Sequence, residues 1–274
     1  MITAITGATS GIGFAATQKL VERGETVIMA CRNRQKAETR RNEIAAHLQL
    51  SQTQAEARMP FVELDLGSIT SCHKAADALQ ALGVERLYNN GASMFSAWGL
   101  SEDGFERNLA TNCIGTVTLT EALKDCPTLK TIVHTVSISC KVAKIDQDVF
   151  SDAPQPHYTR LSNYSTSKLA LFLYISKRCA SGTGTQRVVA LDPGVVNTGM
   201  ITQQRWFDPL ADIFFRPFIR KPETAAQIGI RALDDTENHK LYRGKKTCPF
   251  PDFIQNHPLR DWFYETLIQK IAQA

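Results

Sequence analysis

The sequence has no C-x-x-C pair, no apolar run of membrane-spanning length and no strong excess of one charge. Its seven cysteines are odd in number and scattered, which indicates reduced thiols and argues against a disulfide framework or a zinc site. His47, His73, His134 and His157 have no metal-ligand spacing, so no metal is expected. The net charge of +4 is too small to indicate nucleic-acid binding without a clustered basic patch. No signal peptide precedes the first apolar run, and we therefore expect a cytoplasmic protein without membrane association.

Strand-like and helical patterns alternate along the 274 residues, of which 43% are hydrophobic and 21% charged. Apolar, strand-like runs occupy residues 2–5, 26–30, 61–64, 86–89, 131–136 and 188–191, with a weaker one near 241–242. Helical patterns cover about 33–50, 68–82, 101–124 and 164–178, whereas 51–58 has the composition of a loop. Continuously apolar strands separated by helices are typical of a parallel sheet buried on both faces. We expect an α/β fold: one Rossmann-type, doubly wound domain over residues 1–274, with a central parallel sheet of about seven strands flanked by helices.

A glycine-rich corner lies near the N-terminus. The apolar run Ile2–Ile5 leads into Thr6-Gly7-Ala8-Thr9-Ser10-Gly11-Ile12-Gly13, and a helical pattern follows at once. At such a corner backbone N–H groups and a helix N-terminus face outward unpaired, which makes an anion site. Glycine permits the tight turn and lets the backbone approach a pyrophosphate closely. The flanking strand and helix are the context that a dinucleotide-binding motif requires; the alternative is a loop that only connects the two.

Further motifs follow this corner in order. They are Asn89-Asn90-Gly91 after the fourth strand, Asn112 in a helix, Tyr164-Ser165-Thr166-Ser167-Lys168, and Pro193–Thr198 after the sixth strand. Together with the glycine corner they resemble the short-chain dehydrogenase/reductase family from residue 1 to about 235. The Ala-Cys-Arg-Asn run from Ala30 and the long loop before Tyr164 look most like the retinol-dehydrogenase-like branch.

Tyr164 and Lys168 are four residues apart and so share one face of a helix. A nearby ammonium stabilises a phenolate, which would lower the pKa of the tyrosine towards a range useful for proton transfer at neutral pH. An exposed tyrosine and lysine on a helix surface are the alternative. The resemblance implies that Tyr164 is the acid/base, and that Lys168 lowers its pKa and holds the cofactor ribose.

The family also has a serine after the fifth strand that hydrogen-bonds the substrate oxygen, and an asparagine that helps to hold a water chain leading from the lysine. The family register favours Ser137 for the serine, although Ser139 would point to the same side of an extended strand. Asn112 matches the asparagine, and a simple helix-to-strand bridge is the alternative. The catalytic residues implied by the resemblance are Asn112, Ser137, Tyr164 and Lys168.

Cofactor choice is read at the end of the second strand, where an acid would bind the ribose of NAD and an arginine accommodates the 2′-phosphate of NADP. The sequence there is Cys31-Arg32-Asn33-Arg34, without an acid, and the planar guanidinium of Arg32 suits a phosphate. We therefore expect NADP(H) to be preferred over NAD(H), with Arg34 able to share the role; a solvated basic helix start is the alternative. The residues expected to bind the cofactor are Gly7, Thr9, Ser10, Gly11, Ile12, Gly13, Arg32, Asn33, Asp65, Leu66, Asn90, Gly91, Tyr164, Lys168, Pro193, Gly194, Val196 and Thr198.

Two features depart from the family pattern. The family's usual Asn-Asn-Ala-Gly reads Asn89-Asn90-Gly91-Ala92. Both exchanged residues are small, so the backbone can still approach its neighbours closely, but the exchange leaves the local backbone geometry undetermined. The loop from Ser137 to Tyr164 is long, and we expect it to shape an individual substrate mouth.

The last part of the chain carries two further patterns. Aromatic residues crowd the stretch 205–220, where the family places a mobile lid, so residues 197–222 are expected to cover an apolar substrate. A core helix and a membrane-surface helix are the alternatives. Residues 258–272 have the pattern of an amphipathic helix that packs either on its own core or on another subunit, as in a homodimer.

The sequence therefore predicts an NADP(H)-dependent oxidoreductase that interconverts a carbonyl and an alcohol on an apolar small molecule, with Tyr164 giving or taking the proton. The alternative from another class is a non-catalytic NADP-binding sensor. The intact Tyr164 and Lys168 pair argues against it, because a sensor has no use for a proton donor. An epimerase of the extended branch is a second alternative, against which the short region after the sixth strand argues.

Overall fold

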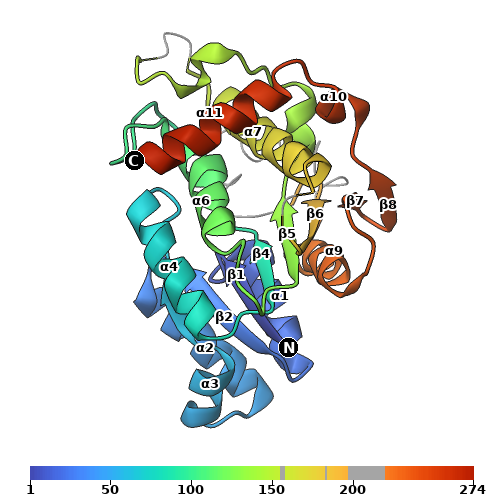
Figure 1. Cartoon of the computed structure of the whole chain (residues 1–274). Helices are drawn as coiled ribbons and strands as arrows, with labels where there is room; N and C mark the ends of the chain where they lie inside the picture. The colour runs from blue at the N-terminus through green and yellow to red at the C-terminus, as the bar shows by residue number, and fades with distance from the viewer. Residues whose placement is uncertain (155–157, 183, 197–219) are drawn as a thin grey trace, which may run out of the picture.

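A computed structural model describes residues 1–154, 158–182, 184–196 and 220–274, and a single β-sheet runs through its centre (Figure 1). The strand order is β3-β2-β1-β4-β5-β6-β7-β8, and every neighbouring pair is parallel except β7 and β8. The strands are β1 (Ile2–Thr6), β2 (Thr26–Cys31), β3 (Phe61–Glu63), β4 (Arg86–Asn89), β5 (Thr131–Thr135), β6 (Arg187–Asp192), β7 (Lys240–Arg243) and β8 (Lys246–Pro249). The predicted α/β fold with a doubly wound parallel sheet is confirmed.

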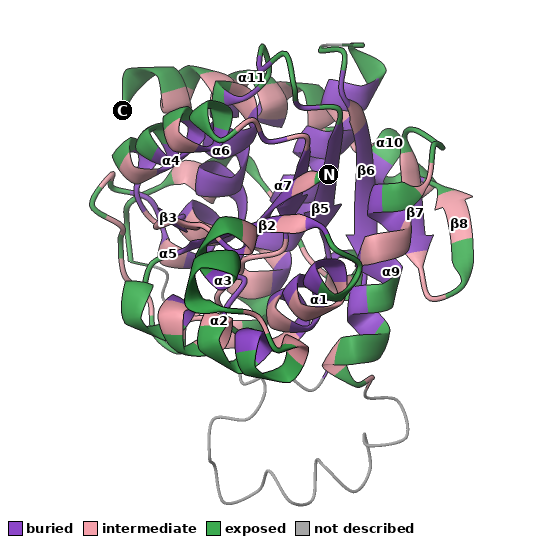
Figure 2. Cartoon of the chain, turned by 90° about the horizontal axis from the view of Figure 1, so that it is seen from below, coloured by how far each residue is buried: buried purple, intermediate pink, exposed green. Residues whose placement is uncertain are grey.

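Helices cover both faces of the sheet, and each face has its own apolar core. One face carries α1 (Gly11–Glu22), α2 (Arg34–Leu48), α3 (Gln52–Arg58) and α9 (Pro222–Asp234). The other carries α4 (Ile69–Ala81), α5 (Arg107–Leu109), α6 (Gly115–Ala122), α7 (Arg160–Ala180), α10 (Asp252–Gln255) and α11 (Arg260–Gln273). Ala4 belongs to one core and Ile5 to the other, because side chains alternate across a strand. Figure 2 shows buried strands such as β5 and β6 between the helices.

The direction in which strands are added reverses between β1 and β4. β2 and β3 lie on one side of β1, whereas β4 to β7 lie on the other. At such a switch point the segments that follow the two strands diverge, and ligands bind in the crevice outside the carboxyl ends. Because the strands are parallel, one edge of the sheet collects the residues that follow each strand within two positions, including Gly7, Arg32, Asn90, Ser137 and Pro193.

Two local predictions are wrong, and one short strand was not predicted. Residues 51–58 form helix α3 rather than a loop, because Ser51 and Gln54 make a reciprocal capping box at its start. The helix expected from residue 101 begins at Arg107, passes through a π-helical turn at Ala110–Ile114 and continues as α6. The short strand β8, with the polar sequence KTCP, has no apolar pattern that would have indicated it.

The C-terminal helix α11 lies along α7 (Figure 1), beginning two residues after the predicted position 258. Tyr264 stacks on Tyr174 of α7 with ring centroids 5.6 Å apart, and Phe263 is fully buried. Of the two alternatives, the helix therefore packs on the core of its own chain; the homodimer stays a prediction. The predicted lid, residues 197–222, lies outside the described residues except at 220–222.

The amino-terminal edge of the sheet is closed by a partly buried ion-pair cluster. Arg86 at the start of β4 donates to Thr3 Oγ1 at 2.9 Å and to Asp234 Oδ1 at 3.0 Å, and it also pairs with Glu25. Arg23 pairs with the second oxygens of Glu25 and Asp234, at 3.0 and 2.8 Å. The cluster ties the sheet to the ends of α1 and α9, at the edge opposite the switch-point crevice.

Candidate active site

The glycine corner between β1 and α1 has the close packing that its sequence predicts. Gly7, with φ of 69°, and Gly11, with φ of 51°, adopt left-handed conformations that favour glycine. A Cβ atom on Gly13 would lie 2.4 Å from the carbonyl oxygen of Gly7 and 2.6 Å from Nδ2 of Asn90. Close approach of neighbouring atoms therefore requires glycine at position 13. The corner forms a cradle at the carboxyl end of β1.

Asn90 and Gly91 are joined to β1 through Thr6. The Thr6 hydroxyl accepts the N–H of Asn90 at 3.0 Å and that of Gly91 at 2.8 Å, and Asn90 Nδ2 donates to the Thr6 carbonyl at 3.1 Å. A Cβ atom on Gly91 would lie 3.0 Å from Leu66 and 3.1 Å from the Thr6 hydroxyl. The order Gly91-Ala92 thus places glycine at position 91, where a side chain would lie very close to Leu66 and Thr6. The backbone after β4 therefore still lies close to the end of β1.

The N-terminus of α1 presents backbone donors at this cradle. Ser10 is the N-cap but makes no side-chain capping bond, and the first turn contains no acidic residue. Such N–H groups at the start of a helix attract an anion. The predicted contacts at Thr9, Ser10, Gly11, Ile12 and Gly13 therefore lie on one turn, and its binding of an anion stays a prediction.

Arg32 extends into solvent at the carboxyl end of β2. Its side chain is 64% exposed, and its Nη1 lies 3.9 Å from Oδ2 of Asp65. The guanidinium of Arg34 lies over the ring of Phe61, 4.4 Å from the centroid, and Asn33 uses its side chain to cap α2. Both predicted arginines are exposed, but the guanidinium of Arg34 is engaged with the Phe61 ring, whereas that of Arg32 extends towards solvent.

Asp65 and Leu66, which are predicted to bind the cofactor, follow β3. Asp65 Oδ1 accepts the N–H of Gly67 at 2.8 Å, which fixes the turn after the strand. The carbonyl oxygen of Leu66 would lie 2.0 Å from a Cβ atom on Gly115, so the start of α6 packs directly against this turn.

Tyr164 and Lys168 lie on α7, four residues apart as the sequence predicts. Lys168 is 1% exposed, and its Nζ donates to the Thr135 carbonyl at 2.9 Å and lies 5.9 Å from the centroid of the Tyr164 ring. Burial lowers the pKa of Lys168 to about 8. Burial also raises the pKa of Tyr164 to about 12, a hydrogen bond with Ser137 lowers it, and the Asp192 carboxylate raises it. The pKa of Tyr164 thus lies above its ordinary value, opposite to the sequence prediction, because burial outweighs the stabilising contacts.

Ser137 is the serine that the geometry favours. Strand β5 ends at Thr135, and a 3₁₀ turn, Ile138–Lys141, begins directly after Ser137. The Ser137 side chain accepts the N–H of Ser139 at 3.2 Å, and its interaction with the Tyr164 side chain lowers the pKa of that phenol. The Ser139 hydroxyl oxygen is buried without a partner among the described residues. Because the chain leaves the extended conformation at residue 138, the two serines do not share one side of a strand.

Asn112 is fully buried in the π-helical turn. Its Oδ1 accepts the N–H of Ser93 at 2.8 Å, and its Nδ2 donates to the Ser93 carbonyl at 2.8 Å and to Ser167 Oγ at 2.9 Å. Ser167 in turn donates to the Tyr164 carbonyl at 2.7 Å. The amide therefore bridges the loop after β4 to the helix that carries Tyr164, while its part in a water chain stays a prediction.

The carboxyl end of β6 is fixed by Asp192, which is 1% exposed. Its Oδ1 accepts the N–H of Gly194 at 2.9 Å, and its Oδ2 pairs with Arg243 Nε at 2.8 Å. Gly194 has φ of 76°, which favours glycine. The predicted turn after β6 is therefore held by a buried carboxylate.

The next residues connect this turn to Arg220. Val196 forms a parallel bridge with Arg220, whose Nη1 donates to the Pro193 carbonyl at 3.2 Å. The predicted cofactor contact Thr198 lies outside the described residues.

Sequence reasoning missed several residues that support this site. Ser167 is adjacent to Lys168, so its position in the motif could have drawn attention to it. Arg40 on α2 donates to the Thr9 carbonyl at 3.3 Å and lies 4.7 Å from the centroid of the Phe14 ring. No local pattern indicates Arg40, because 31 residues separate it from Thr9.

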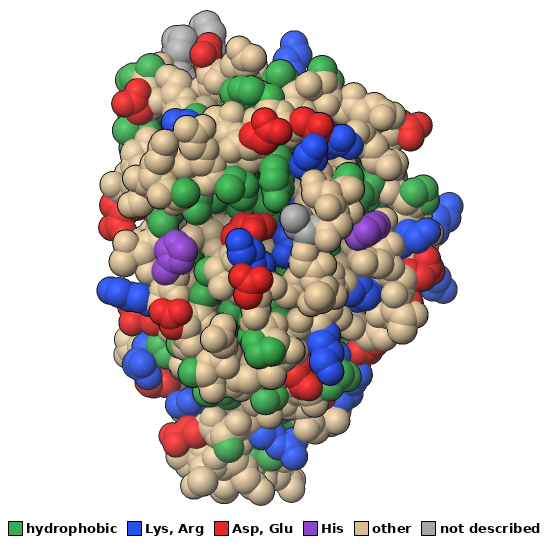
Figure 3. Space-filling view, viewed as in Figure 1, with side chains coloured by type: hydrophobic (Ala, Val, Ile, Leu, Met, Phe, Trp, Pro, Cys, Tyr) green, Lys and Arg blue, Asp and Glu red, His purple; other side chains and the backbone are tan. Residues whose placement is uncertain are grey.

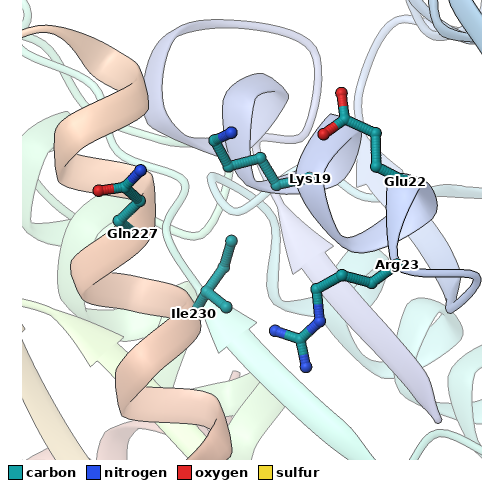
Figure 4. Close-up of a pocket in the computed structure, with 5 residues that line it drawn as sticks. All are labelled: Lys19, Glu22, Arg23, Gln227 and Ile230. Carbon is teal, nitrogen blue, oxygen red and sulfur yellow. The ribbon is translucent and has the colours of Figure 1, made fainter.

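A surface hollow away from this edge is shown in Figure 4. It is a groove lined by Lys19, Glu22 and Arg23 from the end of α1 and by Gln227 and Ile230 from α9. Because α1 runs back from the glycine corner, its last turn lies beside the ion-pair cluster and far from Tyr164. On the face seen in Figure 3, basic and acidic side chains are interspersed.

The described part of the chain contains no group of three His, Cys, Asp or Glu side chains arranged to hold a metal. Within the same ranges, no helix combines the length and the hydropathy needed to cross a membrane.

Comparison with known proteins decides the family. The model of the short chain dehydrogenase family matches residues 1–207, from β1 past the turn after β6. The chain belongs to the short-chain dehydrogenase/reductase family. The resemblance drawn from the glycine corner and from Tyr164 and Lys168 is confirmed.

Individual relatives of this dehydrogenase include retinol dehydrogenase 14 from Mus musculus, 30% identical over 241 residues that cover 82% of this chain and 71% of that protein. WW domain-containing oxidoreductase from Danio rerio is 30% identical over 236 residues, which are 81% of this chain but 55% of that protein, so the chain spans about half the length of that relative. An uncharacterized protein from Mycobacterium Paratuberculosis has a similar structure, with a TM-score of 0.74 and 25% identity over 99% of this chain and 93% of that one. A short chain dehydrogenase from Burkholderia cenocepacia J2315, solved with NADP, shares the fold with a TM-score of 0.64 and 19% identity over 84% and 89% of the two chains.

Proposed function

We propose that this dehydrogenase is an NADP(H)-dependent oxidoreductase that interconverts a carbonyl and an alcohol on an apolar small molecule. The observation that carries the proposal is the buried amine of Lys168, which lies 5.9 Å from the centroid of the Tyr164 ring on the same helix, with the Ser137 side chain placed to lower the pKa of Tyr164. Both hydroxyls lie at the carboxyl edge of the sheet, as does the glycine corner. A substrate oxygen placed between them would receive a hydrogen bond from each.

The residues around the switch point fit a nicotinamide dinucleotide. The N-terminus of α1 offers donors for its pyrophosphate, and glycine at positions 13 and 91 lets the segments after β1 and β4 pack closely around this turn. The exposed guanidinium of Arg32 supports NADP(H), because it can meet a 2′-phosphate with two parallel hydrogen bonds. When bound, the nicotinamide ring supplies or accepts the hydride. Lys168 is the residue proposed to hold its ribose.

Tyr164 is the proposed proton donor in the reductive direction. With its pKa raised to about 12, the phenol is protonated at neutral pH and ready to give its proton to a developing alkoxide. Ser137 orients the same oxygen and stabilises the charge that forms on it. Asn112 and Ser167 hold the backbone of Tyr164 in place from the other side of α7.

The surroundings of Tyr164 support an apolar substrate. Four large apolar side chains near it are exposed: Ile138, Val142, Leu161 and Val195. They lie after Ser137, in the first turn of α7 and after β6, which are the segments that border the proposed substrate position. Apolar residues gathered around polar groups are typical of a small-molecule site. The retinol dehydrogenases among the relatives are named for an apolar alcohol, which agrees with this choice.

The proposal is tested by NADPH oxidation with aldehydes of increasing length, from propanal to decanal. We expect the wild type to favour the longer aldehydes. Tyr164→Phe should keep less than about a tenth of the rate and a nearly unchanged NADPH dissociation constant, because general acid–base catalysis contributes about 10²–10⁴-fold. Tyr242→Phe is the control, since its hydroxyl accepts a hydrogen bond at 3.1 Å from Arg187, the first residue of β6, and none from Tyr164 or Ser137 in the described residues.

A wild type that binds NADPH tightly but turns over no carbonyl of this series would favour the non-catalytic sensor. A Tyr164→Phe variant with more than about a tenth of the wild-type rate would remove Tyr164 as the proton donor.

A further inference from the structure

The Ser93–Phe95 segment, which follows β4, has its backbone held by side chains rather than by a neighbouring strand. At Ser93, the amide of Asn112 bonds with both the N–H and the carbonyl. At Phe95, the N–H donates to Oδ1 of Asn108 at 3.1 Å, and the carbonyl accepts the hydroxyl of Tyr158 at 2.9 Å. Two asparagines spaced four residues apart therefore hold alternate residues of one segment.

The side chains of Asn108 and Tyr158 hydrogen-bond with each other as well as with the backbone of Phe95. Asn108 is fully buried, and its Nδ2 donates to Glu106 Oε1 at 2.7 Å and to the Tyr158 hydroxyl oxygen at 2.8 Å. Glu106 is also buried, and its Oε2 accepts the N–H of Leu109 at 2.9 Å. Because both N–H groups of the Asn108 amide are engaged, its oxygen is fixed towards Phe95.

Arg107 makes further contacts with the same loop, at Phe95, Ala97 and Gly99. Its guanidinium lies 4.8 Å from the centroid of the Phe95 ring and donates to the Ala97 carbonyl at 3.1 Å. Its backbone N–H donates to the Gly99 carbonyl at 3.0 Å. Side chains and one backbone N–H thus bond with the loop after β4 at Ser93, Phe95, Ala97 and Gly99, which limits its motion because these groups would otherwise bond with water.

This segment lies beside the proposed substrate position. Strands β4 and β5 are neighbours, so the residues that follow β4 run next to Ser137, which follows β5. Tyr158 precedes the N-cap of α7 by one residue and Tyr164 by six. The chain of bonds from Ser93 through Asn112 to the backbone of α7 connects the same segment to the proton donor.

We propose that Asn108 and Tyr158 are positioning residues that fix the Ser93–Phe95 segment as a preformed wall of the substrate site. The assignment rests on the proposed function. Neither side chain belongs to the Tyr164 and Lys168 pair or to the glycine corner, so a loosened wall weakens substrate binding while the proton donor and the cofactor cradle are kept. The signature is a raised KM for a long apolar substrate with kcat and NADPH affinity preserved.

The test compares Tyr158→Phe with the wild type, using decanal and NADPH. This variant loses only the hydroxyl that bonds with Phe95 and Asn108. We expect KM for decanal to rise about two- to tenfold, the effect of one net hydrogen bond, with kcat and the NADPH dissociation constant changed less than about twofold. Hydrogen exchange of a peptide covering residues 93–97 should quicken, while peptides of β5 stay unchanged. Tyr242→Phe, which also loses a hydrogen-bonded hydroxyl, should change neither KM for decanal nor hydrogen exchange at residues 93–97.

A second test uses Asn108→Ala, alone and combined with Tyr158→Phe. Because Asn108 and Tyr158 act on the same residue, the double variant should raise KM by less than the product of the two single effects. A lowered melting temperature with unchanged KM and unchanged exchange at residues 93–97 would overturn the positioning role. A wild type that reduces no aldehyde of the series would instead defeat the proposed function, and the positioning role with it.

Discussion

Replacing Lys168 by methionine should stabilise the protein without added cofactor while abolishing its activity. The amine is 1% exposed, and within the described residues its hydrogen bond goes to the Thr135 carbonyl, a neutral group. Burial lowers the pKa of Lys168 from its ordinary 10.5 to about 8, so the folded protein holds the charge at pH 7 at a cost in free energy. Methionine has a similar shape without the charge.

The structure sets the size of this effect. The difference between 10.5 and about 8 corresponds to roughly 3 kcal/mol at about 1.4 kcal/mol per pKa unit. The Thr135 carbonyl would lose its partner, which offsets about 1 kcal/mol. The net gain in the free energy of unfolding at pH 7 is therefore roughly 2 kcal/mol, or about 4–8 °C in Tm for a chain of this size.

The gain should depend on pH in a defined direction. Between pH 8 and 10.5 the unfolded wild type binds a proton that the folded form has lost, so wild-type stability rises with pH over this window. The methionine variant lacks this rise, and its advantage should be full below about pH 8 and shrink towards pH 10.5. Urea unfolding of both proteins at about pH 7 and about pH 9.5 measures the difference.

Lys177→Met is the matched control on the same helix. Lys177 is partly exposed and pairs with Asp261 at 2.9 Å, so its loss should cost at most about 1 kcal/mol and leave no pH-dependent advantage. The reasoning is refuted if Lys168→Met is no more stable than the wild type at pH 7, or if its advantage is the same at both pH values.

Further predictions concern the serines, the cofactor and the ion-pair cluster. Ser137→Ala should cripple turnover and Ser139→Ala should have a small effect; the opposite ranking of steady-state rates would transfer the role. We expect the wild type to bind NADPH about ten- to hundredfold more tightly than NADH, and Arg32→Asp to reduce this preference. Calorimetry with both cofactors at two salt concentrations measures it, and a wild type that binds NADH as tightly as NADPH would contradict the prediction. Arg86→Met should destabilise the protein by about 3 kcal/mol in urea unfolding, because it leaves the buried carboxylate of Glu25 short of a partner, and an unchanged midpoint would show that the cluster contributes nothing.

The sequence was sufficient for the features that depend on neighbouring residues. Alternating apolar runs identify the strands and helices, because each pattern reports which faces of an element are buried. The glycine corner and the pair Tyr164 and Lys168 are readable for the same reason: a turn or a helix places residues a few positions apart on one site. The capping box of Ser51 and Gln54 was also readable in principle, although its segment was predicted to be a loop.

Only the tertiary structure decided what depends on residues distant in the chain. The preference for Ser137, which stays a prediction, follows from the point at which the backbone leaves β5, and the pKa of Tyr164 follows from burial that outweighs local charge. The hold of Asn108 and Tyr158 on Phe95 joins residues up to 63 positions apart. Hydrogen bonds and burial are short-range in space, whereas sequence patterns are short-range along the chain; where the fold brings distant segments together, the environment of a side chain is therefore set by the packed structure.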